Sequence, residues 1–162
     1  MIILGIDPGI ADTGYGIIEI NKDGSLKCLD YGSIKTSAKD PLVNRIEELF
    51  LELNALIKKY KPGIIGVEEL FFNKNVKTAL IVGQARGVVL LAAKMSGARL
   101  VEFTPLQVKQ AVSTYGRANK AQVQRMVKMI LNLKEVPRPD DAADALAVAI
   151  CASNTNNICQ KN

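Results

Sequence analysis

Residues 2–34, IILGIDPGIADTGYGIIEINKDGSLKCLDYGSI, decide the fold class of this chain. The apolar run at 2–6 lacks a helical period and predicts a buried strand, and Asp7-Pro8-Gly9 after it is a turn signal. Residues 14–20 and 26–34 have strand composition, and the Asn-Lys-Asp-Gly between them is typical of a hairpin connection. Three successive strands predict an antiparallel meander.

The apolar spacing becomes helical after this meander. It predicts a helix that ends near Tyr60, with Asp40 as its N-cap and Pro41 in its first position. Residues 64–68 are apolar on both faces, so we expect a central strand there. A second helix is expected over residues 76–96.

The last third of the chain predicts one strand and three helices. A strand at 100–103 precedes a short helix that opens at Thr104. Asn119 and Gln122 have the spacing of a capping box for the next helix, and the final helix is expected over 141–152. This order of elements predicts an α/β fold of the ribonuclease-H-like kind, with a mixed five-stranded sheet and helices on both faces.

Length and composition favour one domain with a sizeable core. The chain has 162 residues, of which 48% are hydrophobic. We expect a single domain over 1–152 and a polar, disordered tail over 153–162. No apolar run is long enough to span a bilayer, and the first residues read as a strand rather than a signal peptide, so a cytoplasmic location is expected.

Cysteine and histidine usage excludes several chemistries. The three cysteines include no C-x-x-C pair, which argues against a disulfide framework or a structural zinc site. The absence of histidine excludes Ser-His-Asp and Cys-His catalysis and imidazole-ligated zinc. Acid–base work in an enzyme of this composition must fall to carboxylates, Lys, Tyr or a metal-bound water.

The positive charge is concentrated in one part of the chain. The net charge is +5, but residues 70–139 contain twelve basic and two acidic residues, a charge of +10, and the rest carries −5. A basic segment of this size suggests an anionic polymer as partner. The alternative at this point is a solvated surface with a charge bias.

Two acids stand at the ends of predicted strands. Asp7 follows the first strand, where a turn-capping role is the simpler alternative. Glu68 ends the predicted central strand, and an acid there is costly unless it is paired or binds a cation. Strand alternation sends Glu68 and Glu69 to opposite faces, so only one of them should join Asp7.

Two further acids lie three residues apart on the Ala-rich last helix. This spacing places Asp141 and Asp144 on one face of the helix. Asp141 is also explained as a partner of the helix dipole, whereas Asp144 lies one turn farther in. Clustered carboxylates select hard cations such as Mg²⁺ or Mn²⁺, and two such ions activate water and stabilise the leaving oxygen of a phosphodiester.

Seven short motifs together resemble the RuvC family of Holliday-junction resolvases. In chain order they are ILGIDPG at 3–9, TGYG at 13–16, VEELF at 67–71, NKN at 73–75, GQARG at 83–87, QVKQ at 107–110 and DAADALA at 141–147. Each motif alone is weak, but all seven occur in the family's order over nearly the whole chain.

The resemblance implies a homodimer that cuts two strands of a four-way junction at symmetric positions with Mg²⁺, for which Mn²⁺ substitutes, and with two ions in each site. It maps the family's acidic site onto Asp7, Glu68, Asp141 and Asp144, and so favours Glu68 over Glu69. It also implies the RuvA–RuvB branch-migration complex as a partner. Lys109 and Lys120 are expected near the scissile phosphate, with Lys120 as a catalytic residue.

The predicted DNA contacts are aromatic and basic. Phe71 and Phe72 follow Glu68, and although a core role is usual for Phe, an exposed ring there would stack on an unpaired base. The resemblance assigns this role to Phe71, and the role of Phe72 stays open. The candidates for phosphate contact, each of which has a solvated surface residue as its alternative, are Lys74, Lys77, Arg86, Lys109, Arg117 and Lys120.

The second predicted helix is apolar on more faces than a half-exposed helix requires. One face would cover the sheet, and a second would be free for a two-fold dimer, unless the helix is buried within a single domain. Three other functions are alternatives: an ATPase of the actin or sugar-kinase kind, a relative of this fold that processes ribosomal RNA, and a module that binds branched DNA without cutting it. The first needs two related domains, and the intact acids argue against the last.

Overall fold

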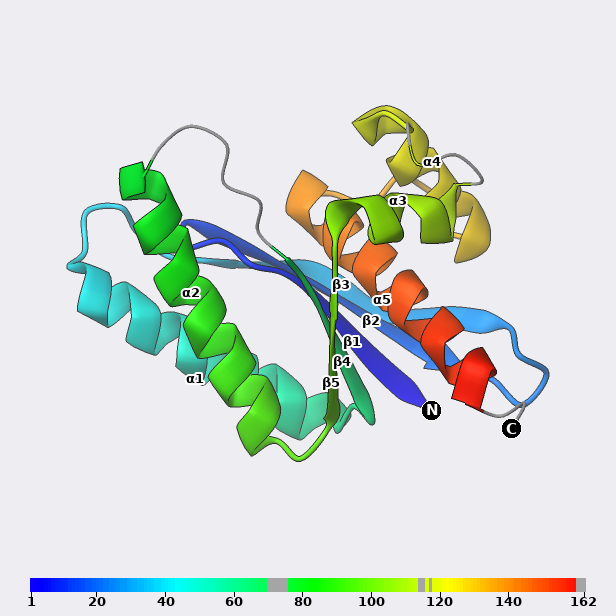
Figure 1. The fold of residues 1–162 in the computed structure, drawn as a ribbon, viewed down its shortest axis with the longest axis horizontal. Coiled ribbons are helices and arrows are strands. Elements are labelled where there is room, and N and C mark those ends of the chain that lie inside the picture. Colours follow the sequence, from blue (N-terminus) through cyan, green and yellow to red (C-terminus); the bar gives the residue numbers. More distant parts are fainter. Residues whose placement is uncertain (70–75, 114–115, 117, 160–162) are drawn as a thin grey trace.

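The structure is a computed structural model, and it describes residues 1–69, 76–113, 116 and 118–159. Five strands and five helices are found in this part of the chain (Figure 1). In chain order they are β1 (Ile2–Asp7), β2 (Asp12–Ile20), β3 (Leu26–Lys35), α1 (Leu42–Tyr60), β4 (Ile64–Glu68), α2 (Val76–Met95), β5 (Arg99–Phe103), α3 (Pro105–Val112), α4 (Lys120–Ile130) and α5 (Asp140–Cys159).

The five strands form one mixed sheet in the order β3-β2-β1-β4-β5. The first three strands pair antiparallel, which confirms the predicted meander, while β1, β4 and β5 run parallel. The register pairs Ile6 with Val67 in the parallel ladder and Asp7 with Gly14 in the antiparallel one. The last residues of β1 and β4 therefore lie side by side at one end of the sheet.

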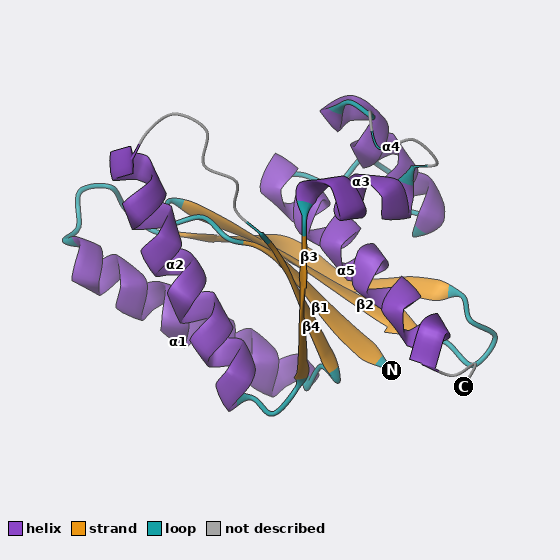
Figure 2. Ribbon diagram, in the orientation of Figure 1, coloured by secondary structure: helices purple, strands orange, loops and turns teal. Residues whose placement is uncertain are grey.

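Helices cover both faces of the sheet, as predicted (Figure 2). On one face α1 and α2 bury residues such as Leu49, Leu53 and Val89 against Leu4 and Ile65 of the strands. On the other face α3, α4 and α5 form a second apolar cluster with the strands. None of the helices in the described part of the chain has the length and apolar character needed to cross a bilayer.

Helix α5 packs directly on the sheet because the strands beneath it carry glycine. A Cβ atom at Gly5 would overlap the carbonyl oxygen of Ala145, and one at Gly14 would overlap the carbonyl oxygen of Asp141. The helix contributes mostly alanine to this contact, and its residues from Ala145 to Ile150 are almost fully buried. Small residues on both surfaces bring the helix backbone into contact with the strand backbone.

Two predicted boundaries were wrong. Asp40 does not cap α1: its N–H donates to the carbonyl of Ser37 in a turn, and Pro41 takes the N-cap position without a side-chain cap. The polar segment after Ala152 is not a tail up to Cys159, because α5 continues through it. The Ser153 hydroxyl donates to the carbonyl of Ile150, so this polar side chain is satisfied by its own helix.

Gly14→Ala should lower the free energy of unfolding by about 3 kcal/mol or prevent folding, because the added methyl group must displace the α5 backbone. Chemical denaturation measures this loss. Gly63→Ala is the control, since the nearest atom to its added Cβ would lie 3.6 Å away. Equal stability of the two variants would contradict the direct packing of α5 on β2.

Candidate active site

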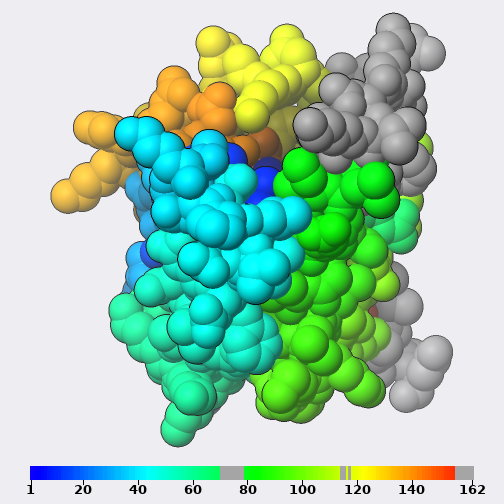
Figure 3. Space-filling view, turned by 90° about the vertical axis from the view of Figure 1, so that its left-hand side faces the viewer, coloured from blue at the N-terminus to red at the C-terminus, as the bar shows by residue number. Residues whose placement is uncertain are grey.

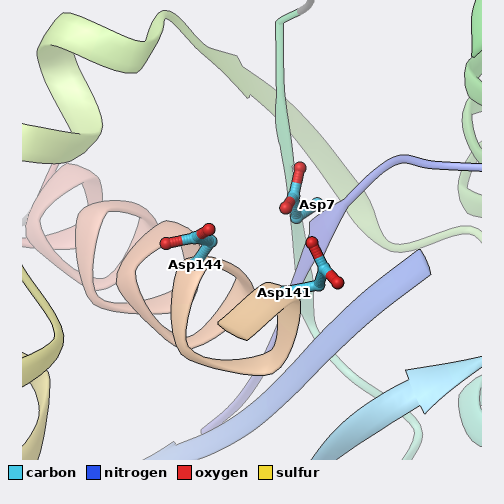
Figure 4. Close-up of side chains that lie close together, drawn as sticks. All are labelled: Asp7, Asp141 and Asp144. Carbon is cyan, nitrogen blue, oxygen red and sulfur yellow. The ribbon is translucent and has the colours of Figure 1, made fainter. Parts of the chain in front are cut away.

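Three aspartates converge where β1 ends and α5 begins. Asp7 is the last residue of β1, and Asp141 and Asp144 lie in the first two turns of α5. One carboxylate oxygen from each lies within 4.8 Å of the other two. Figure 4 shows the three side chains gathered around one space between the strand and the helix. The structure thus brings together residues that the sequence separates by more than a hundred positions.

Local packing explains this convergence. Asp7 pairs with Gly14 across the β1–β2 ladder, and Gly14 in turn contacts the backbone of Asp141. The carbonyl of Pro139 accepts the N–H of Ala142, which fixes the first turn of α5. The position of the helix start relative to β1 is therefore set by backbone contacts rather than by the charged groups.

Glu68 joins the aspartates from β4. It ends the strand that pairs with β1, and together with Asp144 it lines a cavity of about 280 Å³. Glu69 continues the chain toward β5, where its N–H donates to the carbonyl of Phe103 over 2.7 Å. The residues that line the cavity include Glu68 and not Glu69.

The cavity is lined by both charged and apolar side chains. Lys109 of α3 and Lys120 of α4 add positive charge beside the two acids, and the apolar lining comes from Pro105, Val108, Val123 and Ala147. Figure 3 views the molecule from the side of α1 and α2, where a little of the dark blue N-terminal part of the chain is visible between these helices and the yellow and orange segments. An elongated anion would find acids, lysines and an apolar wall in one place.

Burial and mutual repulsion keep the central acids from ionising at their usual pH. Burial, with the charges of Glu68, Asp144 and Asp141, raises the pKa of Asp7 to about 7, although Lys120 opposes the rise. Burial and the charge of Asp144 raise the pKa of Glu68 to about 7 against the effect of Lys109 and Lys120. Both carboxyls would ionise fully at neutral pH only if more positive charge were added.

A fifth carboxylate, which the sequence analysis missed, lies beside the cluster. Burial and the charge of Asp12 raise the pKa of Asp141, so Asp12 acts on this acid from the start of β2. The Oδ1 atom of Asp12 is buried and has no hydrogen-bond partner among the described residues. The only signal in the sequence was an acid five residues after Asp7, just before the strand predicted at residues 14–20.

Lys120 lies closest to Asp144. Its Nζ atom is 3.0 Å from Asp144 Oδ2 and 3.6 Å from Asp140 Oδ2. Burial alone would lower the pKa of Lys120, but the hydrogen bond to Asp144 and the charges of Asp144, Asp140 and Asp141 raise it above its ordinary value. Lys120 therefore stays a cation at the edge of the acid cluster.

The donor set fits a hard divalent cation. Carboxylate oxygens are the ligands that Mg²⁺ and Mn²⁺ prefer, and three of them already lie within reach of one ion. The raised pKa values of Asp7 and Glu68 and the unpartnered oxygen of Asp12 show that protein groups alone do not neutralise this cluster. Asp7, Asp141 and Asp144, with Glu68 beside them, could hold such a cation.

The predicted DNA contacts have different outcomes. Arg86 pairs with Glu102 of β5, so in this structure its guanidinium ties α2 to the sheet. Lys109 and Lys120 line the cavity. The side chain of Lys77 is not described, and four predicted contacts lie outside the described residues, namely Phe71, Phe72, Lys74 and Arg117.

Comparison with known proteins decides the family. The model of the family described as crossover junction endodeoxyribonuclease RuvC matches residues 3–152. The chain belongs to the RuvC family. Family members named crossover junction endodeoxyribonuclease RuvC include one from Halothermothrix orenii, 53% identical over 99% of this chain and 97% of its own length. Another, from Clostridioides difficile, is 56% identical over 98% of this chain and 93% of its own length.

A solved structure of a RuvC protein supports the fold. T. thermophilus RuvC in complex with Holliday junction substrate superposes with a TM-score of 0.87 at 35% identity, over 97% of this chain and 96% of that chain. The ribonuclease-H-like fold that the order of elements predicted is therefore confirmed. The RuvC family model matches nearly the whole chain. This match favours the junction nuclease over the ATPase and over the relative that processes ribosomal RNA.

Without metal, the protein should lose stability as the pH rises. The raised pKa values of Asp7 and Glu68 mean that the folded chain binds more protons than the unfolded chain between about pH 4 and pH 7. The two carboxyl groups therefore favour the folded state most below about pH 4, and this contribution to the free energy of unfolding is lost as the pH rises past about 7. Thermal unfolding in EDTA should show this fall, and Mg²⁺ should reverse it at pH 8.

Asp7→Asn should reduce the fall, because Asn does not titrate and does not repel Glu68. Asp40→Asn is the matched control, since Asp40 is exposed in the turn before α1. A pH dependence in Asp7→Asn equal to that of the unmodified protein would show that the acid cluster is not its source.

Proposed function

We propose that this chain cuts four-way junctions with Asp7, Glu68, Asp141 and Asp144 as the ligands of Mg²⁺, two ions in each site. As a RuvC-family member, the chain is an endonuclease that resolves Holliday junctions in recombination and repair. The observation that carries the residue assignment is the convergence of Asp7, Asp141 and Asp144 within 4.8 Å. The bound metal supplies positive charge that activates a water molecule and stabilises the leaving oxygen of the phosphodiester.

The protein's own residues bind and orient the substrate. Lys109 and Lys120 line the same cavity as Glu68 and Asp144, so a phosphate bound in this cavity would meet an ammonium group beside the acids. Charge that develops on the phosphate oxygens is stabilised there without reorganisation of the site. The apolar wall around Val108 and Val123 offers a surface for deoxyribose or base rather than for solvent.

Symmetric cutting of two strands requires two sites, and α2 offers a surface for a second copy of the chain. Leu80, Leu91 and Met95 are 64%, 54% and 68% exposed, and lie near one side of α2. Gly83 and Gly87, which lie with them, have open space where a Cβ would be. Large apolar side chains beside small ones suit close helix packing across a two-fold axis.

The same function implies the remaining partners and the location. We propose that Phe71, with Phe72 as the alternative, stacks on an unpaired base at the junction, and that Lys74, Lys77, Arg86 and Arg117 contact phosphates. Of these contacts, that of Arg86 requires the phosphate to replace Glu102 as its partner. We also propose the RuvA–RuvB complex as partner, which would bring the protein to migrating junctions in the cytoplasm. These assignments rest on the family's motifs in this chain and on its basic segment.

Incubation with a synthetic mobile four-way junction tests the proposal. Mg²⁺ should produce paired nicks at symmetric positions on two strands, and the products should be mapped on denaturing gels. Asp7→Asn should slow cutting by about 1,000-fold or more, because the metal loses a central ligand. Junction binding by this variant in a gel-shift assay should be retained.

Asp40→Asn is again the control and should cut at the rate of the unmodified protein. Equal cutting of linear duplex and junction would contradict the structure-selective assignment, and cutting by Asp7→Asn would remove Asp7 from the metal site.

Leu91→Glu should convert the dimer to a monomer, because it places a charge in the apolar surface of α2. Analytical ultracentrifugation at micromolar concentration measures the change. Leu51→Glu is the matched control, since Leu51 is 59% exposed but lies on α1. Dissociation by the Leu51 variant and not by the Leu91 variant would move the interface from α2 to α1.

A further inference from the structure

Lys120 lies between two carboxylates of α5, and only one of them belongs to the proposed metal ligands. Its Nζ atom lies 3.0 Å from Asp144 Oδ2 and 3.6 Å from Asp140 Oδ2. Asp140 and Asp144 are four residues apart, so their side chains lie one turn apart on the same side of the helix. Lys120 therefore has a second anion within reach.

The carboxylate of Asp140 is held from its other side. Arg138 Nη1 donates to Asp140 Oδ1 over 2.6 Å, and the buried side-chain amide of Gln124 also hydrogen-bonds to this carboxylate. Oδ2 is the oxygen that faces Lys120. The second anion is thus oriented by neighbours that are not metal ligands.

The backbone of Lys120 is fixed as well. Lys120 is the first residue of α4, directly after the N-cap Asn119. It lies within the capping box of Asn119 and Gln122, whose two hydrogen bonds measure 2.8 and 2.9 Å. The Lys120 side chain is 53% exposed and that of Asp140 is 43% exposed. The ammonium group can change partner by rotation of an exposed side chain, with no movement of the core.

We propose that Asp140 is a positioning residue that accepts the Lys120 ammonium group when a divalent cation binds Asp144. The cation and the ammonium group would otherwise compete for the same carboxylate, and like charges this close repel. The move to Asp140 frees Asp144 and keeps Lys120 at the edge of the cavity, where the substrate phosphate arrives. This inference rests on the metal site of the proposed function.

The test is a double-mutant cycle on metal affinity, measured with the full chain and Mn²⁺ by isothermal titration calorimetry without DNA. Asp140→Asn keeps the shape and an acceptor for Arg138 but removes the charge, and should weaken Mn²⁺ binding by about tenfold. In a Lys120→Gln background the same change should alter affinity by less than about twofold, because no ammonium group remains to be moved. Asp140→Glu should restore most of the affinity.

A second readout follows the lysine itself. With saturating Mg²⁺, NMR of the Lys120 side-chain Cε and Nζ should show an ordered side chain in the unmodified protein and a mobile one in Asp140→Asn. Equal order in the two proteins would overturn the proposal, as would an Asp140→Asn effect on affinity of the same size with and without Lys120.

Two further variants separate this inference from the metal site on which it rests. Glu135→Gln removes an exposed acid from the connection between α4 and α5, and should change Mn²⁺ affinity by less than about twofold. A loss as large as that of Asp140→Asn would mean that Asp140 acts only through its negative charge, and would overturn the proposal. Asp144→Asn must weaken Mn²⁺ binding. If it does not, the proposed metal site fails; if it does while Asp140→Asn has no effect, only the role of Asp140 fails.

Discussion

The contact between the backbone of α5 and the backbones of β1 and β2 is the constraint on which the site depends. Gly5 and Gly14 leave no side chain between the strands and the helix, so the start of α5 is placed against the end of β1. A metal ligand must lie within about 2.0–2.6 Å of the ion. A methyl group would lie 2.2 Å from the Ala145 oxygen if added at Gly5, or 2.0 Å from the Asp141 oxygen if added at Gly14. It would force α5 away from the strands, and the aspartates would no longer meet at one point.

This packing brings together charges that repel one another. The raised pKa values of Asp7 and Glu68 record the free energy that the fold gives up to hold these carboxyls in a buried place. Lys109 and Lys120 offset part of the repulsion and remain beside the cavity where a phosphate would bind. Stability lost at the cluster is compensated by the apolar cores on the two faces of the sheet, a division typical of functional sites.

Much of this arrangement was visible along the chain. Apolar period and turn residues predicted the meander and the central strand, because both depend on neighbours in sequence. The capping box of Asn119 and Gln122 was predicted for the same reason, and its hydrogen bonds form. The short helix opens at Thr104 as predicted. The predicted cap at Asp40 failed because the N-cap position falls one residue later, on Pro41, and Asp40 belongs to the preceding turn. The polar residues after Ala152 led to a predicted end of α5 that is too early. In the structure the hydroxyls of Ser153 and Thr155 donate to carbonyls of their own helix, so these polar residues continue it.

By itself the sequence determined which residue types were available. It has acids at strand ends and on one face of an Ala-rich helix, lysines between them in the chain, and no histidine. Only the tertiary structure decided which of these groups meet. The charge of Asp12 on Asp141, the pairing of Arg86 with Glu102 and the position of Lys120 between Asp140 and Asp144 all join separate elements. Such contacts depend on how closely a helix approaches a sheet, and that distance is set by packing across the whole fold rather than by any local pattern.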